Sequence, residues 1–242
     1  MGVNPEKYND VTPWQMLQKR MTWNQLGPLK NQRILDFGSG NGMTADYYAE
    51  HNWVIAVEPS HEMLENAFRD FDYKQLIGSV EKLQSLESES FDVVLCHNVL
   101  EYVEDRSRIM NEFCRLLKPD GVISILKHNR LGRVMQMVIL LNNFEHAQAL
   151  LDGESGKAEQ YGMIDYYENG QLITWCPQLT IEKVYGLRTF WGLQQNQQIQ
   201  EGMEWQEKML EMEERASTME DFKNVAFFHH VFLRKKRVSI LE

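Results

Sequence analysis

Short apolar runs alternate with helical segments through the first half of the chain. Each run is apolar at nearly every position, a pattern typical of a strand buried on both faces of a sheet. These runs cover residues 33–37, 53–58, 91–96 and 121–126. The segments between them predict helices over residues 43–51, 61–71 and 107–117, and a turn over residues 118–121. Strands that alternate with helices predict a doubly wound α/β fold with a mostly parallel sheet.

A helix is predicted ahead of this core, over residues 12–26. Thr12 and Pro13 are typical of a helix N-cap and first helical position, and Gly27-Pro28 stops the helix. The spacing of its apolar residues predicts one buried face. That face consists of Trp14, Leu17 and Met21.

The second half of the chain predicts helices, a loop and two further strands. Residues 130–151 predict helix, residues 152–170 predict a loop or lid, and residues 179–190 and 224–233 have β character. Apolar residues at spacings of four and three predict an amphipathic helix between these strands. Its predicted apolar positions are Trp205, Met209, Met212, Ala216 and Met219.

The first buried strand runs directly into a glycine-rich turn. Asp36 is followed by Gly38, Gly40 and Gly42, and a predicted helix comes next. Glycines in this strand–turn–helix context let backbone N–H groups approach a bound ligand closely. Glu58 ends the next strand, where its carboxylate can accept two hydrogen bonds from a ribose diol. The pattern predicts a nucleoside-containing cofactor at the carboxyl edge of the sheet.

Both NAD and S-adenosylmethionine bind at turns of this kind, so the glycines alone leave the cofactor open. The spacing here is Asp36-x-Gly38-x-Gly40-x-Gly42, which differs from the G-x-G-x-x-G of dinucleotide sites. Asp36 would repel a pyrophosphate, but it can pair with the cationic amino group of S-adenosylmethionine. We therefore favour S-adenosylmethionine over a nicotinamide cofactor.

Residues 30–128 resemble the class I S-adenosylmethionine-dependent methyltransferases in the order of their motifs. Residues 76–83 resemble the segment that meets the adenine, although Ser79 stands where the family usually has Asp. Residues 91–103 resemble the fourth motif, and residues 117–122 resemble the turn before strand five. The resemblance implies a Rossmann-like, seven-stranded sheet with an N-terminal helix and a helical insertion or lid after strand five. It also implies cofactor contacts from Asp36, Gly38, Ser39, Gly40, Gly42, Glu58, Pro59, Ser60, Met63, Ser79, Val80, Glu81 and His97.

Beyond strand five, the chain resembles the bacterial tRNA wobble-uridine methyltransferases that esterify the carboxylate of 5-carboxymethoxyuridine. The matching features are residues 97–103, Asn129 with Gly132, residues 143–145 and residues 186–190, in that order. The resemblance implies methyl transfer to a carboxylate oxygen, with tRNA or a small molecule as the acceptor.

His97 is the best single candidate for a catalytic residue, because it follows the fourth strand at the predicted carboxyl edge. A base, a substrate contact and a buried structural histidine are the alternatives for it. A carboxylate acceptor is already ionised at neutral pH and needs no base, whereas an amine or phenol needs one. The sequence shows no base with a recognisable partner, which favours a carboxylate or thiolate acceptor, or catalysis by proximity alone.

Several other residues are candidates for acceptor binding. His128 and Asn129 follow the fifth strand and are expected at the same edge of the sheet. Arginines can hold a carboxylate or phosphate by bidentate pairing, and surface salt bridges are the alternative use for each of them. The candidate substrate-binding residues are Tyr8, His128, Asn129, Arg130 and Arg188, with Arg133 as a further arginine.

The formal net charge of −10 disfavours nonspecific binding of nucleic acid. A small-molecule methyltransferase and a non-catalytic S-adenosylmethionine-binding protein are therefore kept as alternatives to a tRNA enzyme. The three cysteines are scattered and no His, Asp or Glu set has metal spacing, so we expect a cytoplasmic protein without a metal site. No apolar run approaches the roughly 20 residues of a membrane span, so we expect no membrane partner.

We expect residues 1–242 to form a single methyltransferase domain. Within it, residues 30–128 are the predicted cofactor-binding core. Residues 129–222 are the predicted acceptor-side insertion and helices, and residues 223–242 are the last strand and a basic tail.

Overall fold

The computed structural model describes residues 11–158 and 162–237. The chain divides into two compact units, each built from segments that are distant in sequence. Unit 1 comprises Met1–Pro28, His128–Glu159 and Val184–His230. Unit 2 comprises Leu29–Lys127, Gln160–Lys183 and Val231–Glu242.

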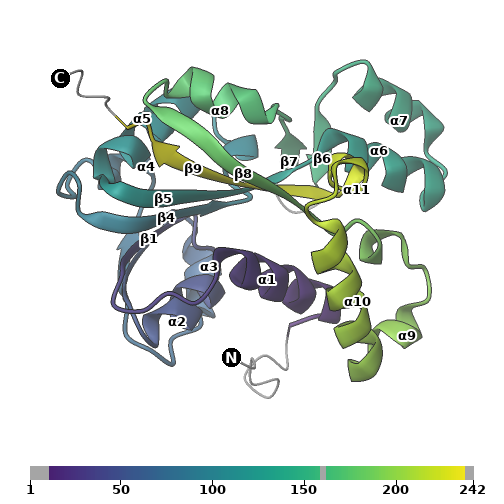
Figure 1. The fold of residues 1–242 in the computed structure, drawn as a ribbon, viewed down its shortest axis with the longest axis horizontal. Coiled ribbons are helices and arrows are strands. Elements are labelled where there is room, and N and C mark those ends of the chain that lie inside the picture. Colours follow the sequence, from purple (N-terminus) through teal and green to yellow (C-terminus); the bar gives the residue numbers. More distant parts are fainter. Residues whose placement is uncertain (1–10, 159–161, 238–242) are drawn as a thin grey trace. The chain divides into compact units, whose positions relative to one another are not determined.

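A seven-stranded, mostly parallel sheet is the main element of the fold (Figure 1). Its strands lie in the order β3-β2-β1-β4-β5-β9-β8, and the pairings among β1 to β5 are parallel. The predicted strands at 33–37 and 53–58 are confirmed residue for residue, and the sheet confirms the predicted doubly wound class. The strands are β1 (Arg33–Phe37), β2 (Trp53–Glu58), β3 (Lys74–Ile77), β4 (Phe91–His97), β5 (Leu117–His128), β8 (Leu179–Leu187) and β9 (Phe228–Lys235).

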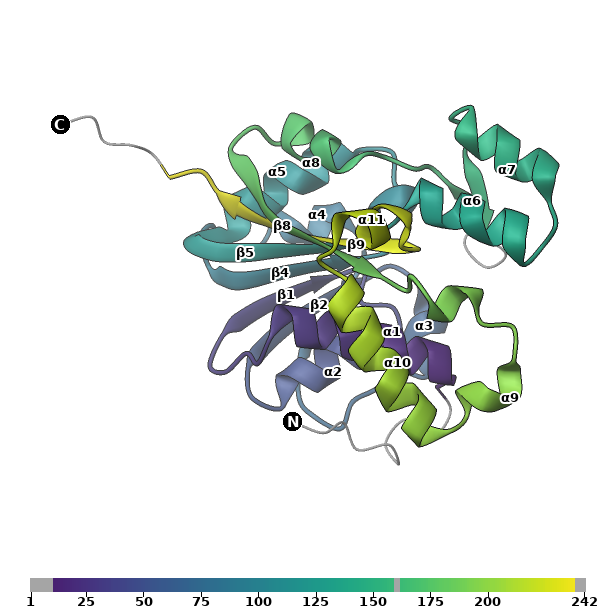
Figure 2. The same cartoon turned by 45° about the vertical axis from the view of Figure 1, so that its right-hand side comes forward.

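The helices of unit 2 lie on both faces of its strands (Figure 2). One face carries α2 (Met43–Ala49) and α3 (His61–Glu65). The other face carries α4 (Val80–Leu83), α5 (Arg106–Leu116) and α8 (Asn169–Trp175). Side chains of β1 and β4 such as Leu35 and Val94 are fully buried between these layers, as the apolar runs predicted. A short 3-10 helix, η2 (Leu100–Tyr102), follows β4.

Unit 1 is built mainly from helices. In it, α1 packs against α10, where Arg20 pairs with Glu207 at 2.8 Å and Asn24 donates a hydrogen bond to Glu214. The predicted helix over 130–151 is two helices, because the chain breaks at residues 140–143, where Asn142 has a positive φ. The helices are α1 (Pro13–Leu26), α6 (Arg130–Ile139), α7 (Phe144–Leu151), η3 (Trp191–Leu193), α9 (Gln197–Gln200), α10 (Met203–Ala216) and α11 (Glu220–Val225).

Three local predictions are wrong, and long-range contacts explain two of them. The helix predicted over 61–71 ends at Glu65, because the backbone N–H groups of Phe68 and Phe71 donate instead to Asn41 and Asp46. The turn predicted over 118–121 lies inside β5 as an irregularity in its register with β4. Lys118 pairs there with Asp92 of β4 at 2.7 Å. Finally, strands β6 (Gly156–Ala158) and β7 (Gly162–Ile164) occur in the predicted loop at 152–170.

The predicted apolar faces of two helices are wrong in part. Trp14 on α1 is 42% exposed, whereas Leu17 and Met21 are buried as predicted. On α10 and beyond it, Met212 and Met219 are exposed. The buried residues of α10 are Leu210, Glu213 and Ala216, so the face is rotated by about one position from the prediction.

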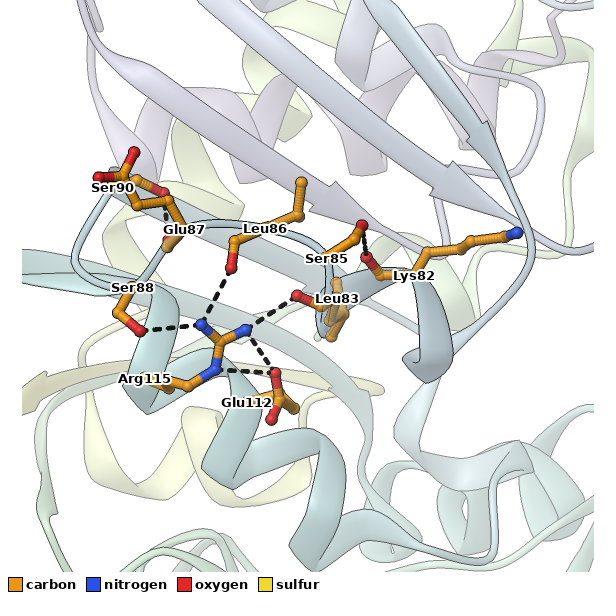
Figure 3. Close-up of polar contacts among 9 residues, drawn as sticks. All are labelled: Lys82, Leu83, Ser85, Leu86, Glu87, Ser88, Ser90, Glu112 and Arg115. Atoms are coloured by element: carbon orange, nitrogen blue, oxygen red, sulfur yellow. Dashed lines mark hydrogen bonds and ion pairs between the residues drawn. The ribbon is translucent and has the colours of Figure 1, made fainter.

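Arg115 of α5 fixes the loop that leads from α4 to β4 (Figure 3). Its guanidinium donates to the backbone oxygens of Leu83 and Leu86 and to the Ser88 hydroxyl, at 2.9 to 3.0 Å. Glu112, one turn earlier on the same helix, accepts from two guanidinium nitrogens and holds the side chain in place. A loop whose carbonyl groups are satisfied in this way enters β4 in a defined register.

His230 of β9 is fully buried in unit 1, where its Nδ1 lies 2.8 Å from Gln25 Oε1. Burial lowers the pKa of His230 to about 3, because the protonated ring would lose its hydration. The unfolded chain takes up this proton near pH 6.5, so stability is present above that pH and is lost as the pH falls towards 3. We therefore expect His230 to cost the protein about 2 kcal/mol of unfolding free energy between pH 7 and pH 5.

Urea denaturation of wild type and His230→Gln at pH 7 and pH 5 tests this. The variant should lose about 2 kcal/mol less than wild type over that interval. Replacing the exposed His61 by glutamine is the matched control and should leave the pH dependence unchanged. Equal losses in wild type and His230→Gln would show that His230 does not stay neutral in the folded protein.

Candidate functional site

The candidate site lies in unit 2, at the carboxyl edge of the parallel strands. In the register of β1 with β2, Asp36 is opposite Ala56 and Phe37 is opposite Val57. Glu58 follows at the end of β2, opposite Ile77 of β3. Asp36 and Glu58 therefore stand at the same edge of neighbouring strands, as the proposed cofactor site requires.

The glycine-rich turn closes tightly onto the end of β2. The N–H groups of Gly38 and Ser39 both donate to the carbonyl oxygen of Val57, at 2.8 and 3.1 Å. Gly38, Gly40 and Gly42 have φ values of +74°, +57° and +74°, the left-handed region that favours glycine. A Cβ at Gly42 would lie 2.2 Å from the Tyr73 hydroxyl oxygen, so a side chain at this position would require Tyr73 to move.

The Glu58 carboxylate connects this turn to the start of α3. Its Oε2 accepts from the Gly40 N–H at 2.8 Å, and its Oε1 accepts from the Ser60 N–H at 2.9 Å. The residue is only 7% exposed. Because each carboxylate oxygen has two lone pairs, both oxygens can still accept a hydrogen bond from a ligand diol.

Asp36 and Ser39 supply buried polar atoms beside the turn. Asp36 is only 3% exposed. Burial is the largest cause that raises the pKa values of Tyr48 and Cys96, and the charge of Asp36 adds to it. The Ser39 hydroxyl is buried and has no hydrogen-bond partner among the described residues. A buried hydroxyl normally has a partner, so this one fits a polar group of a bound ligand. The acidic and hydroxyl groups together suit a zwitterionic, cationic cofactor such as S-adenosylmethionine.

The segments after β2 and β3 complete the predicted cofactor edge. Ser60, which follows Pro59, caps α3 by accepting from the Met63 N–H. The Gly78 N–H donates to the Glu58 carbonyl oxygen, which ties the segment after β3 to the end of β2.

Glu81 folds back on the first residues of its own helix. Its carboxylate accepts from the Ser79 N–H at 2.8 Å, a bond that also lowers the pKa of Glu81. It thus stabilises the turn just before Val80, the first residue of α4. The predicted cofactor contacts of Ser79, Val80 and Glu81 remain predictions.

His97 is the last residue of β4, and its ring is held by the neighbouring strand. Its Nε2 lies 2.9 Å from the hydroxyl oxygen of Ser124, a fully buried residue of β5. The next residue, Asn98, has a φ of +57° and donates its N–H to the Leu126 carbonyl oxygen. The ring is thus oriented by β5, and its catalytic role stays a prediction.

The predicted acceptor-binding residues belong to unit 1, and two of them are used to hold that unit together. The Asn129 amide donates to the carbonyl oxygens of Asn224 and Ala226, at 2.9 and 2.8 Å. Arg130 Nη1 donates to the carbonyl oxygens of Leu150 and Glu154. These contacts give both side chains a structural use, and their substrate contacts remain predictions.

The other predicted acceptor residues have different surroundings. The His128 ring packs against Phe227 and Phe228, at centroid distances of 5.5 and 4.7 Å. The Arg188 guanidinium lies over aromatic rings of unit 1. Tyr8 lies outside the described residues, and so do the last residues of the predicted tail.

Sequence reasoning missed Glu213, which organises the segment after β8. It is fully buried, and its carboxylate accepts from the backbone N–H groups of Thr189, Phe190 and Trp191 at 2.8 to 2.9 Å. Burial raises the pKa of this carboxyl, and the three N–H donors oppose that effect. A signal was available, because Glu213 is four residues after Met209 and three before Ala216, on the apolar face of α10.

The described part of the chain shows neither a cluster of metal ligands nor a membrane-spanning helix. In residues 11–158 and 162–237, no three His, Cys, Asp or Glu side chains are grouped as metal ligands would be. None of the helices in those ranges has the length and apolar content needed to cross a bilayer. The three cysteines are buried and free of disulfide bonds.

Known proteins that are similar to this chain include methyltransferases of several kinds. A family model described as "Methyltransferase domain" matches residues 35–125, which include β2, β3 and β4 and parts of β1 and β5. The tRNA 5-carboxymethoxyuridine methyltransferase of Escherichia coli strain K12 is 27% identical, covering 97% of this chain and 90% of the relative. The ubiquinone biosynthesis O-methyltransferase of Haemophilus ducreyi is 26% identical, covering 64% of this chain and 66% of the relative.

Solved structures share the fold at low sequence identity. An S-adenosylmethionine-dependent methyltransferase from Mesorhizobium loti matches with a TM-score of 0.57 and 19% identity, covering 93% of this chain and 99% of that chain. A structure from Listeria monocytogenes described as an S-adenosylmethionine-dependent methyltransferase matches with a TM-score of 0.58 and 16% identity. The match covers 93% of this chain and 97% of that chain. The glycine-rich turn and the two acids at one sheet edge, together with the matched methyltransferase model and the class I fold, identify the enzyme as an S-adenosylmethionine-dependent methyltransferase.

Proposed function

We propose that this enzyme methylates a carboxylate oxygen, and that its acceptor is the 5-carboxymethoxy group of a tRNA wobble uridine. The observation that carries the proposal is the extent of one sequence match. The tRNA methyltransferase of Escherichia coli matches 97% of this chain, including the segments of unit 1. The ubiquinone O-methyltransferases match between 39% and 64% of the chain. Likeness outside the cofactor core favours a shared acceptor class.

The chemistry of the site is consistent with a carboxylate acceptor. Bound S-adenosylmethionine supplies a methyl group that its sulfonium activates for transfer to a nucleophile. A carboxylate is ionised at neutral pH, so the protein needs to provide only alignment and exclusion of water. His97 suits such a positioning role because its Nε2 is already bonded to Ser124. Glu58 and the glycine-rich turn would hold the cofactor, with the Ser39 hydroxyl available to its polar end.

A small-molecule O-methyltransferase is the second candidate. The net charge of −10 favours it, because an acidic protein repels the phosphates of tRNA at long range. The ubiquinone biosynthesis relatives favour it as well, although their matches cover less of the chain. A phenol acceptor of that kind would need a base to remove its proton.

In vitro methylation of tRNA distinguishes the two. The acceptor is tRNA that carries 5-carboxymethoxyuridine, and the control is the same tRNA with 5-hydroxyuridine, which lacks the carboxylate. We expect mass spectrometry of the nucleosides to show one added methyl group on the first tRNA alone. Mild alkali should remove it, because esters hydrolyse under those conditions and methyl ethers do not. Methylation of simple phenols with no methylation of either tRNA would instead support the second candidate.

A further inference from the structure

The guanidinium of Arg188 lies among aromatic rings in unit 1. Its Cζ is 4.9 Å from the ring centroid of Phe227, 5.7 Å from that of Phe228 and 5.2 Å from that of Trp14. The Nε atom is buried and has no hydrogen-bond partner among the described residues. A charged donor without a partner is costly to bury, so its retention here calls for a reason.

The acid nearest to Arg188 is already engaged elsewhere. Both carboxylate oxygens of Glu213 accept backbone N–H groups of the three residues that follow Arg188. Glu213 therefore fixes the turn in which Arg188 has a φ of +59°, and it makes no ion pair with the guanidinium. Burial lowers the pKa of Arg188 to about 10, and the charge of Glu213 only partly offsets this. The guanidinium is still protonated at neutral pH.

A second guanidinium adds to the positive charge. Burial is the largest cause that lowers the pKa of Arg188, and the positive charge of Arg133 lowers it further. Arg133 Nη1 donates to Gln136 Oε1 at 3.1 Å, while its Nε is buried without a hydrogen-bond partner in the described part of the chain. Neither arginine pairs with a carboxylate of residues 11–158 or 162–237. Two nearby cations with two unused buried donors form a site that an anion would complete.

Gly192 lies next to these donors. The point where a Cβ of residue 192 would stand is 3.1 Å from Gln136 Nε2, 3.9 Å from Arg188 Nη2 and 4.0 Å from Arg188 Nε. No side chain fills this point, and all three of the nearest atoms are nitrogens that can donate hydrogen bonds. One hydrogen of Gln136 Nε2 goes to the Gly192 carbonyl oxygen at 3.4 Å, so its other hydrogen and the Arg188 nitrogens are the donors on this side.

We propose that Arg188, Arg133 and Gln136 form an oxyanion-binding site for the methyl acceptor. The ligand is a group with two anionic oxygens, a carboxylate or a phosphate, that pairs with the guanidinium edge while the aromatic rings cover its faces. The inference deepens the proposed function and rests on it for the identity of the acceptor. The site itself is a property of unit 1 and can be tested without methyl transfer.

Direct binding of small probes to the full chain tests the site in the absence of cofactor. Phenoxyacetate carries a carboxymethoxy group on a planar ring, and phenoxyacetamide is its uncharged analogue. Inorganic phosphate is the probe for a phosphate group of the acceptor. By calorimetry we expect wild type to bind one or both anions and not the amide. Arg188→Met and Arg133→Met should each weaken anion binding by about 10-fold or more. Arg20→Met removes an arginine of unit 1 that is paired with Glu207, and should leave binding unchanged.

Stability gives a second readout that separates a ligand site from a structural residue. Replacing an uncompensated buried charge by an apolar side chain of similar length is often neutral or stabilising. Arg188→Met should therefore match or exceed the melting temperature of wild type measured without ligand. Tighter binding of phosphate than of phenoxyacetate would assign the site to a phosphate of the acceptor. No anion binding by wild type, or unchanged binding by Arg188→Met, would overturn the proposal.

The two proposals fail in different ways. If tRNA is not methylated but phenoxyacetate binds through Arg188, the proposed function is wrong and the oxyanion site stands. If Arg188→Met methylates tRNA as wild type does, with the same KM, the site is wrong and the function stands. Gly192→Ala adds a check that keeps both arginines, because its methyl group would lie within 4.0 Å of all three donors and should weaken anion binding.

Discussion

Replacement of Glu58 by glutamine is expected to weaken S-adenosylmethionine binding by about 100-fold. The carboxylate accepts from the Gly40 and Ser60 N–H groups with different oxygens, so either orientation of an amide would place an NH2 group against one donor. The amide also lacks the charge that strengthens hydrogen bonds from ribose hydroxyls. Two such bonds at the lower end of their usual range account for a 100-fold change.

Calorimetry with S-adenosylmethionine and with its demethylated product measures this effect. Glu62→Gln, an exposed carboxylate in the first turn of α3, is the matched control and should bind as wild type does. A cofactor analogue without the ribose hydroxyls separates direct contact from damage to the turn. It should bind weakly to wild type, and Glu58→Gln should weaken its binding by far less than about 100-fold. An equal further loss in the variant would mean that Glu58 acts only through the turn.

The elements that the sequence predicted well are those whose pattern is local. β1 and β2 are mostly apolar and end in a glycine turn or at an acid, so their bounds could be read without knowledge of their neighbours. The tight turn expected at Gly38, Gly40 and Gly42 is likewise local, since glycine readily adopts the left-handed φ values found there. The cofactor edge was predictable because it is built from these local features.

Other features depend on contacts between residues that are distant in sequence. α3 ends early because Phe68 and Phe71 bond to the glycine turn and to α2, which no pattern within residues 61–71 reveals. Asn129 was a reasonable substrate contact from its position after β5, yet its amide holds the backbone almost a hundred residues later. The hydrogen-bond partners of such side chains are set by tertiary structure. The sequence therefore identifies polar residues as candidates for a site but does not show what they bind.

Gly38→Ala is expected to destabilise the protein by about 4 kcal/mol. A Cβ at residue 38 would lie 2.2 Å from Val99 Cγ2 and 3.3 Å from both Val99 Cβ and Val99 Cγ1. Rotating Val99 gives no relief, because its χ1 is restricted and both methyl groups are close to the new atom. The left-handed φ of +74° adds a cost of about 1–2 kcal/mol.

Gly40→Ala separates the cost of the left-handed φ from the cost of the clash with Val99. Gly40 also has a left-handed φ, of +57°, but a Cβ there would meet nothing within 4 Å. Its alanine variant should lose only about 1–2 kcal/mol of unfolding free energy in urea, the cost of the backbone conformation. Val99→Ala in the Gly38→Ala background should then restore most of the remaining difference, since it removes the two methyl groups that obstruct the new side chain. If the double variant is as unstable as Gly38→Ala, the clash with Val99 is not the cause. The backbone of the segment after β4, and not the Val99 side chain, would then be what excludes a side chain at residue 38.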